Sequence, residues 1–238
     1  SHIEVIFRDI ANKEEMGAYS FLADMLSQSS KTYPRKKDLI TRFEELYKII
    51  VYAATLRVGN ILDFHISLDF INPEYINDHN YLEEVIKTLF DIVENPNVTN
   101  DEFDLKTFNI VKERLKREIN SLKENPMKQS IKEAFKAMNA NTPTSYELLG
   151  TLENLEKITP SSIYKTYKNL RKNFKVDIFL IGNLEMDDTV QLIKKYFKNR
   201  YIIENKLDLM VDNKEVKRLV VKSMSSDNVQ SNLVMIFN

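Results

Sequence analysis

Cysteine is absent from this chain of 238 residues, and only four glycines and three histidines occur. Without cysteine the chain can form no disulfide and can offer no thiolate to a metal. The glycines, at positions 17, 59, 150 and 182, are too scattered for a phosphate-binding loop, which excludes P-loop and dinucleotide-binding sites. The histidines, at positions 2, 65 and 79, include no pair at metal-ligand spacing.

An excess of either charge and long apolar runs are also lacking. Lys and Arg number 34 against 35 Asp and Glu, so the net charge of -1 gives no field that would attract nucleic acid or an acidic membrane. No stretch approaches the roughly 20 apolar residues of a membrane span, and no signal peptide opens the sequence, so we expect a cytoplasmic protein. With 43% hydrophobic residues the chain can bury a sizeable core.

Hydrophobic periodicity predicts both strands and helices. Residues 61–71 give the clearest strand, because apolar and polar residues alternate there, and Gly59-Asn60 predicts a hairpin with the preceding strand. The dense apolar run 176–183 predicts a central strand. Further strands are expected at 3–10, 49–58, 217–222 and 233–237. Helices are expected at 13–26, 38–48, 81–93, 103–122, 127–138, 146–155, 160–170 and 186–197.

The segment from Gly17 to Leu26 resembles the zinc helix of the insulinase/pitrilysin metallopeptidases, the inverted zincins, which reads roughly Gly-x-x-His-x-x-Glu-His. In that family the two histidines hold zinc and the glutamate activates the attacking water. With Gly17 aligned, Ser20 occupies the position of the first histidine, Ala23 that of the glutamate and Asp24 that of the second histidine. The resemblance therefore implies a degenerate motif, with no catalytic residue and no bound zinc.

Other pieces resemble the family in the order expected. They are the edge-strand segment Tyr52-Ala53-Ala54-Thr55, the helix segment 112–119, the loop 150–160 and the turn 181–184. The resemblance implies an α+β fold of the LuxS/mitochondrial-processing-peptidase type: a two-layer α/β sandwich whose mixed, mostly antiparallel sheet is covered by helices. It also implies an insulinase-like half domain at 1–200, a linker at 201–214 and, from the match at Gln230-Ser231-Asn232-Leu233, the start of a tandem half domain at 215–238.

Two sites keep alternatives open. Glu118 matches the family's third zinc ligand, which would be a vestigial position here. It lies seven residues after Val111 on the same helix seam, which predicts a half-buried side chain. Alternatively, Glu118 pairs with the basic residues of its own helix. The segment Tyr52-Ala53-Ala54-Thr55 either forms an exposed sheet edge that accepts an extended peptide, or packs beneath a helix in a central strand. Asp24, Glu118 and Ser20 together supply too few oxygen ligands for a firm Mg²⁺ or Ca²⁺ site.

Two functional hypotheses follow from the resemblance. The first is a noncatalytic peptidase homologue that binds an extended peptide or supports a catalytic partner. The second is an essential subunit of a heterodimeric zinc peptidase whose homologous partner carries the zinc motif. A purely structural scaffold without peptide affinity is a third, weaker reading.

Overall fold

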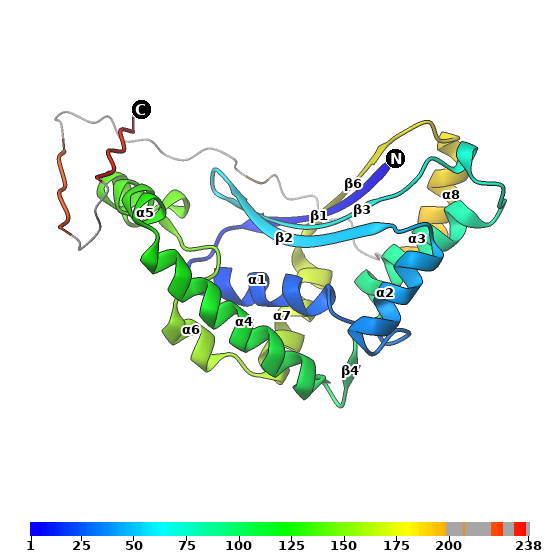
Figure 1. Ribbon diagram of the computed structural model, residues 1–238, viewed down its shortest axis with the longest axis horizontal. Helices are drawn as coiled ribbons and strands as arrows, with labels where there is room; N and C mark the ends of the chain where they lie inside the picture. The colour runs from blue at the N-terminus through cyan, green and yellow to red at the C-terminus, as the bar shows by residue number, and fades with distance from the viewer. Residues whose placement is uncertain (199–206, 208–219, 226–230, 237–238) are drawn as a thin grey trace.

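A four-stranded antiparallel sheet, with strand order β2-β3-β1-β6, forms one layer of the molecule (Figure 1). The computed structural model describes residues 1–198, 207, 220–225 and 231–236. The strands are β1 (His2–Ile10), β2 (Ile50–Val58), β3 (Ile61–Asp69) and β6 (Lys175–Ile181). A separate two-stranded ladder joins β4 (Val98–Thr99) to β5 (Glu102–Phe103).

The second layer consists of helices, and α1, α4, α6 and α7 lie on one face of the sheet (Figure 1). The helices are α1 (Met16–Leu26), α2 (Lys36–Glu45), α3 (Tyr81–Glu94), α4 (Leu105–Glu124), α5 (Pro126–Asn139), α6 (Leu152–Lys157), α7 (Pro160–Asn173) and α8 (Met186–Tyr196). Short 3-10 turns occupy Pro73–Tyr75 and Pro143–Ser145. The predicted α+β sandwich is confirmed, and every strand pair of the four-stranded sheet is antiparallel.

The core lies between the sheet and the helices. Alternation along β1 and β3 sends Val5, Phe7, Phe64 and Ile66 to the helical side, where none of them is exposed. Phe7 and Phe64 are partners in the register, and their rings meet edge to face at 6.2 Å. The opposite face of β3 carries polar residues, as the alternating pattern predicts.

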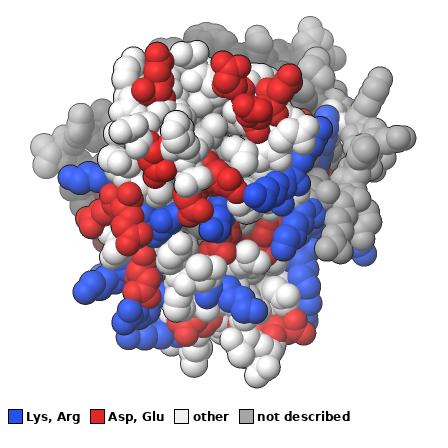
Figure 2. All heavy atoms as spheres, turned by 90° about the vertical axis from the view of Figure 1, so that its right-hand side faces the viewer, with Lys and Arg blue, Asp and Glu red and all other residues white. Residues whose placement is uncertain are grey.

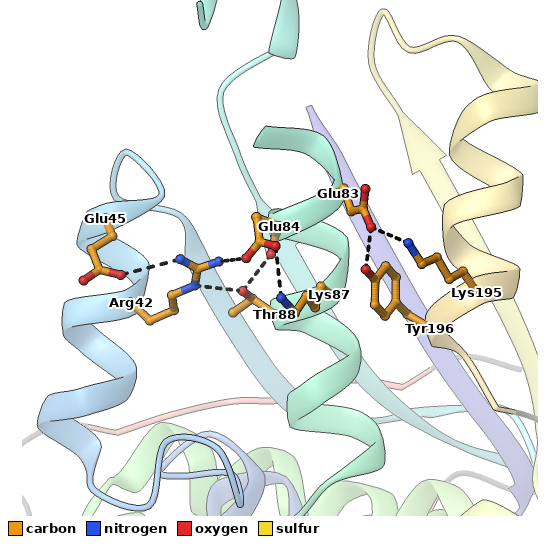
Figure 3. Close-up of polar contacts among 8 residues, drawn as sticks. All are labelled: Arg42, Glu45, Glu83, Glu84, Lys87, Thr88, Lys195 and Tyr196. Atoms are coloured by element: carbon orange, nitrogen blue, oxygen red, sulfur yellow. Dashed lines mark hydrogen bonds and ion pairs between the residues drawn. The ribbon is translucent and has the colours of Figure 1, made fainter. Parts of the chain in front are cut away.

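Polar contacts tie together the end of the molecule formed by α2, α3 and α8 (Figure 3). Arg42 of α2 reaches Glu84 and Thr88 of α3. Glu83 of α3 accepts hydrogen bonds from Lys195 and Tyr196 of α8, at 2.6 and 2.5 Å. Acidic and basic side chains are interspersed over most of this end (Figure 2), in keeping with the balanced composition.

The apolar run of β6 lies at an edge of the sheet that the described strands form, where the sequence predicted a central strand, so that prediction is wrong for the described sheet. Val176, Ile178 and Leu180 pack against the core, but Phe179 and Ile181 on the other face are 46% and 65% exposed. An apolar run fits burial on both faces, whereas helices cover only one face of the described sheet.

Several helix boundaries differ from the sequence prediction by two or more residues, and two of the differences have a clear local cause. The expected helix 146–155 begins only at Leu152, because Gly150 adopts a left-handed φ of 70° and Thr151 caps the helix by accepting a hydrogen bond from the Asn154 backbone. Helix α4 begins at Leu105 rather than at 103, because the Asp104 side chain accepts from the Thr107 backbone N–H at 2.8 Å.

The predicted linker 201–214 and second half domain 215–238 lie largely outside the described residues. Within the expected strands 217–222 and 233–237, residues 220–222 and 233–236 are described and do not belong to a strand. Lys222 forms an ion pair with Glu133 of α5 at 2.5 Å. None of the described helices combines the length and apolarity needed to cross a bilayer.

Candidate functional site

Helix α1 presents Ser20, Ala23 and Asp24 on one face, because residues three and four apart lie above one another in a helix. Ser20 and Ala23 are buried, with 6% and 2% exposure, and the Asp24 side chain is 24% exposed. All three line one cavity of about 510 Å³.

The other walls of this cavity come from four parts of the chain. The edge strand β2 supplies Ala53, Ala54, Thr55 and Arg57. Helix α4 contributes Leu115, Glu118, Ile119 and Leu122, and helix α5 contributes Lys128, Gln129, Ile131, Lys132 and Phe135. Residues 144–150 close the remaining side. The structure thus brings together every candidate position named from the sequence except Tyr52, which is 57% exposed and does not line the cavity.

The Ser20 hydroxyl joins three elements inside the cavity wall. It donates to the Leu148 carbonyl at 2.6 Å, so its single proton is used and Thr55 Oγ1, also 2.6 Å away, donates to it. This arrangement ties α1 to β2 and to the segment 144–150. At the position that the resemblance aligns with the first zinc histidine, the chain therefore has a structural hydroxyl with satisfied hydrogen bonds.

Asp24 is held by Arg114 of α4, whose Nη2 lies 2.5 Å from Asp24 Oδ1. Burial raises the pKa of Asp24 above its ordinary value, and Arg114 offsets part of that rise. Sequence analysis did not predict this pair. The one available signal was that Arg114 lies four residues before Glu118 and so shares its helix face.

Glu118 lines the cavity but is exposed, so the prediction of a half-buried side chain is wrong. The seam of α4 runs through Leu115 and Ile119, which are 2% and 3% exposed, and Glu118 lies beside it at the rim. No ion pair within 4 Å joins Glu118 to a described side chain.

Two glycines allow the segment 144–150 to approach α1. A Cβ on Gly17 would lie 2.9 Å from the Leu149 carbonyl oxygen, and one on Gly150 would lie 3.0 Å from the Gly17 Cα. Side chains at either position would force the two backbones apart. Arg57 of β2 also donates a hydrogen bond to the Tyr146 carbonyl, which fastens the same segment from the other side.

The residues of this cavity do not fit a zinc ion. Ser20 is hydrogen-bonded, Asp24 is paired with Arg114, and Ala23 offers no group to activate water. Throughout the described part of the chain, no three His, Cys, Asp or Glu side chains gather closely enough to hold a metal.

Among the described strands, β2 lies at one edge of the sheet, and this free edge faces the cavity. The turn at Gly59-Asn60 has a positive φ of 57° at Gly59 only, as in a type II′ hairpin turn, which makes Val58 and Ile61 a hydrogen-bonded pair. Because such pairs alternate along an unbroken antiparallel register, the N–H and C=O groups of Ala53, Thr55 and Arg57 point away from β3. No described residue hydrogen-bonds to them across that edge.

Comparison with solved structures identifies the class to which this fold belongs. The crystal structure of a conserved protein from Enterococcus faecalis V583 matches with a TM-score of 0.83 and 25% identity, over 87% of this chain and 49% of that one. A peptidase M16 inactive domain from Pseudomonas fluorescens matches with a TM-score of 0.62 and 13% identity, over 85% of this chain and 47% of that one. The chain has the half-molecule fold of the M16 peptidases, the insulinase/pitrilysin type.

A curated relative supports the same relationship in sequence. The probable inactive metalloprotease YmfF of Bacillus subtilis (strain 168) is 25% identical over 222 residues, which cover 90% of this chain and 52% of the relative. No family model matches the chain. The chain is thus similar in sequence to a protein named as a probable inactive metalloprotease, in keeping with the degenerate motif, and it spans about half the length of that curated relative.

Proposed function

We propose that this chain is a noncatalytic M16-type half domain that binds an extended peptide along the free edge of β2 and supports a homologous partner carrying the zinc motif. The observation behind this proposal is that the free edge of β2 and the degenerate zinc-helix face of α1 line one cavity.

The edge has the properties that strand addition requires. The outward N–H and C=O groups of Ala53, Thr55 and Arg57 can pair with a peptide backbone whatever its sequence. Ala53 and Ala54 are small, so a second backbone can approach without displacing large side chains. A peptide strand bound there directs alternate side chains toward the cavity.

The cavity favours binding over cleavage. Leu115, Ile119 and Phe135 give it apolar walls suited to a peptide side chain. The positions that perform hydrolysis in active relatives are occupied by Ser20, Ala23 and Asp24, and none of these provides a metal or a general base. The bound peptide is therefore retained intact by this chain.

Two proline substitutions test the edge. Proline removes an outward N–H at Ala53 but a ladder N–H at Ala54, because Ala54 pairs with His65 of β3 through hydrogen bonds. The probe is an amidated nonapeptide of high β-propensity that carries fluorescein on its N-terminus, Thr-Thr-Val-Thr-Leu-Thr-Asn-Thr-Thr, used together with its reversed sequence.

Ala53→Pro should keep the circular dichroism of the wild type while weakening peptide binding, measured by fluorescence anisotropy. Ala54→Pro should lower the unfolding midpoint. Wild-type affinity retained in Ala53→Pro, or no binding of either peptide by the wild type, would refute the proposal. Peptidase activity that appears only on mixing with a zinc-motif homologue would instead assign the chain to an essential subunit of a heterodimeric peptidase.

A further inference from the structure

Arg57 is a half-buried cation in the cavity wall with no acidic partner among the described side chains. Its guanidinium donates to the Tyr146 carbonyl, and no carboxylate of the described chain lies within 4 Å of it. Burial alone lowers the pKa of Arg57, with no acidic neighbour to oppose that effect. A guanidinium carries five N–H donors, so the described part of the chain engages only a small part of its binding capacity.

None of the three carboxylates that line the cavity pairs with Arg57: Glu118 lies more than 4 Å from it, and Glu147 and Asp24 are bound by other cations. Glu147 follows Tyr146 directly, yet its carboxylate lies 2.7 Å from Lys132 and 3.6 Å from Lys136 of α5. Asp24 is bound by Arg114. No described acidic side chain neutralises Arg57. A carboxylate of an incoming ligand can therefore pair with it without breaking an existing ion pair.

Arg57 also lies in register with the proposed peptide. Its backbone groups point to the free edge together with those of Ala53 and Thr55, and its side chain lies on the helical face of the sheet, as the contacts of Thr55 with Ser20 and of Arg57 with Tyr146 show. A peptide added to β2 places every second side chain on this face. Two successive peptide side chains on this face therefore lie opposite Thr55 and opposite Arg57. The one opposite Thr55 is beside the apolar wall of the cavity.

We propose that Arg57 binds a carboxylate of the docked peptide, so that this site selects extended peptides with an acidic group two positions from an apolar side chain. The inference rests on the proposed peptide-binding function and adds the chemical class of the peptide. A planar guanidinium in a partly dry site can grip a carboxylate through two parallel hydrogen bonds, which a lysine cannot reproduce.

Matched peptides test this proposal on the full chain. In the nonapeptide above, and in its reversed sequence, Asp replaces Asn, which changes the charge and leaves the shape nearly the same. A second pair of peptides is truncated after Asn, and one of them ends in a free carboxylate while the other ends in an amide. Comparing them shows whether Arg57 binds a C-terminal carboxylate rather than an acidic side chain. The protein variants are Arg57→Gln, Arg57→Lys and the charge-matched control Lys106→Gln, since Lys106 is exposed on α4.

The wild type and Lys106→Gln should bind one of the acidic peptides about tenfold more tightly than its neutral counterpart, as expected for a hydrogen bond to a charged group. Arg57→Gln should bind both with the weaker affinity, and Arg57→Lys should fall between. The preference of the wild type should decline with added salt. Circular dichroism checks that the variants are folded.

Equal binding of acidic and neutral peptides by the wild type would overturn the role of Arg57 and leave the edge-binding function standing. Discrimination that survives in folded Arg57→Gln would overturn it too. If no peptide binds, both the inference and the proposed function fail.

Discussion

Asp24 Oδ1 and Arg114 Nη2 lie 2.5 Å apart, at the position where active relatives are expected to hold zinc through a histidine. The side chains are 24% and 44% exposed, so Asp24 is the more deeply placed partner. Because burial raises the pKa of Asp24 despite the arginine, the ionised carboxylate is held at a cost to stability at neutral pH. Asp24 is therefore engaged by a protein cation at the position that the family resemblance aligns with a zinc histidine.

Replacing Asp24 by Asn should change how stability depends on pH. The folded-state pKa of Asp24 lies above its unfolded value of about 4, so its contribution weakens as pH rises from about 4 through the folded value. Relative to Asp24→Asn, the wild type should therefore gain stability as pH falls from 7 toward 4 in urea denaturation. Glu113→Gln, at an exposed position beside Arg114, is the control. A difference that stays constant with pH would contradict the expectation.

Ser20 is the hydroxyl that joins α1 to β2 and to Leu148, and its removal should loosen all three. Ser20→Ala leaves a buried Thr55 hydroxyl and the Leu148 carbonyl without this partner, so it should lower the free energy of unfolding by about 1–3 kcal/mol. Ser121→Ala, at an exposed site on α4, should change stability by less than about 0.5 kcal/mol. Chemical denaturation measures both, and equal effects would assign Ser20 no special role.

The sequence predicted the framework of the site well because that framework depends on short-range periodicity. Helical spacing put Ser20, Ala23 and Asp24 on one face, and alternation together with Gly59-Asn60 identified the β2-β3 hairpin. These patterns are properties of single elements. For the segment 52–55, where an exposed edge and a central strand were both open, the structure places β2 at an edge of the described sheet.

What the sequence could not supply depends on contacts between distant elements. The pairing of Asp24 with Arg114 joins residues 90 positions apart in sequence by bringing α1 against α4. The edge position of β6 in the described sheet depends on which strands pair beside it, and an apolar run such as 176–181 does not encode that. The segment 146–150 is irregular because Gly17 and Gly150 must touch, a contact that no local propensity reports.

The purified chain should bind no stoichiometric zinc and should not cleave peptides alone. Ser20 and Asp24 are engaged by protein partners, and Ala23 cannot activate water. Elemental analysis of tag-free protein after incubation with zinc should show well below one equivalent. Near-equimolar zinc that is lost in Asp24→Asn would show that these residues do form a site.

His65, on the polar face of β3, should make the free energy of unfolding depend on pH. Its Nδ1 lies 2.6 Å from Glu4 Oε1 and its Nε2 lies 3.8 Å from Asp63 Oδ2, and the carboxylates of Asp63 and Glu4 raise the pKa of His65 above its ordinary value. The resulting stabilisation is fully present below the unfolded pKa of about 6.5 and is lost as pH rises through the folded value.

The free energy of unfolding of the wild type should therefore exceed that of His65→Gln by more at pH 6 than at pH 9. After solvent screening this change should be on the order of 1 kcal/mol. His79→Gln, at an exposed position, is the matched control and should give a difference that is flat with pH. An NMR titration of the His65 ring should show its midpoint above about 6.5. Parallel pH profiles for the wild type and His65→Gln, or a midpoint below that value, would show that the carboxylates do not hold the charged imidazole.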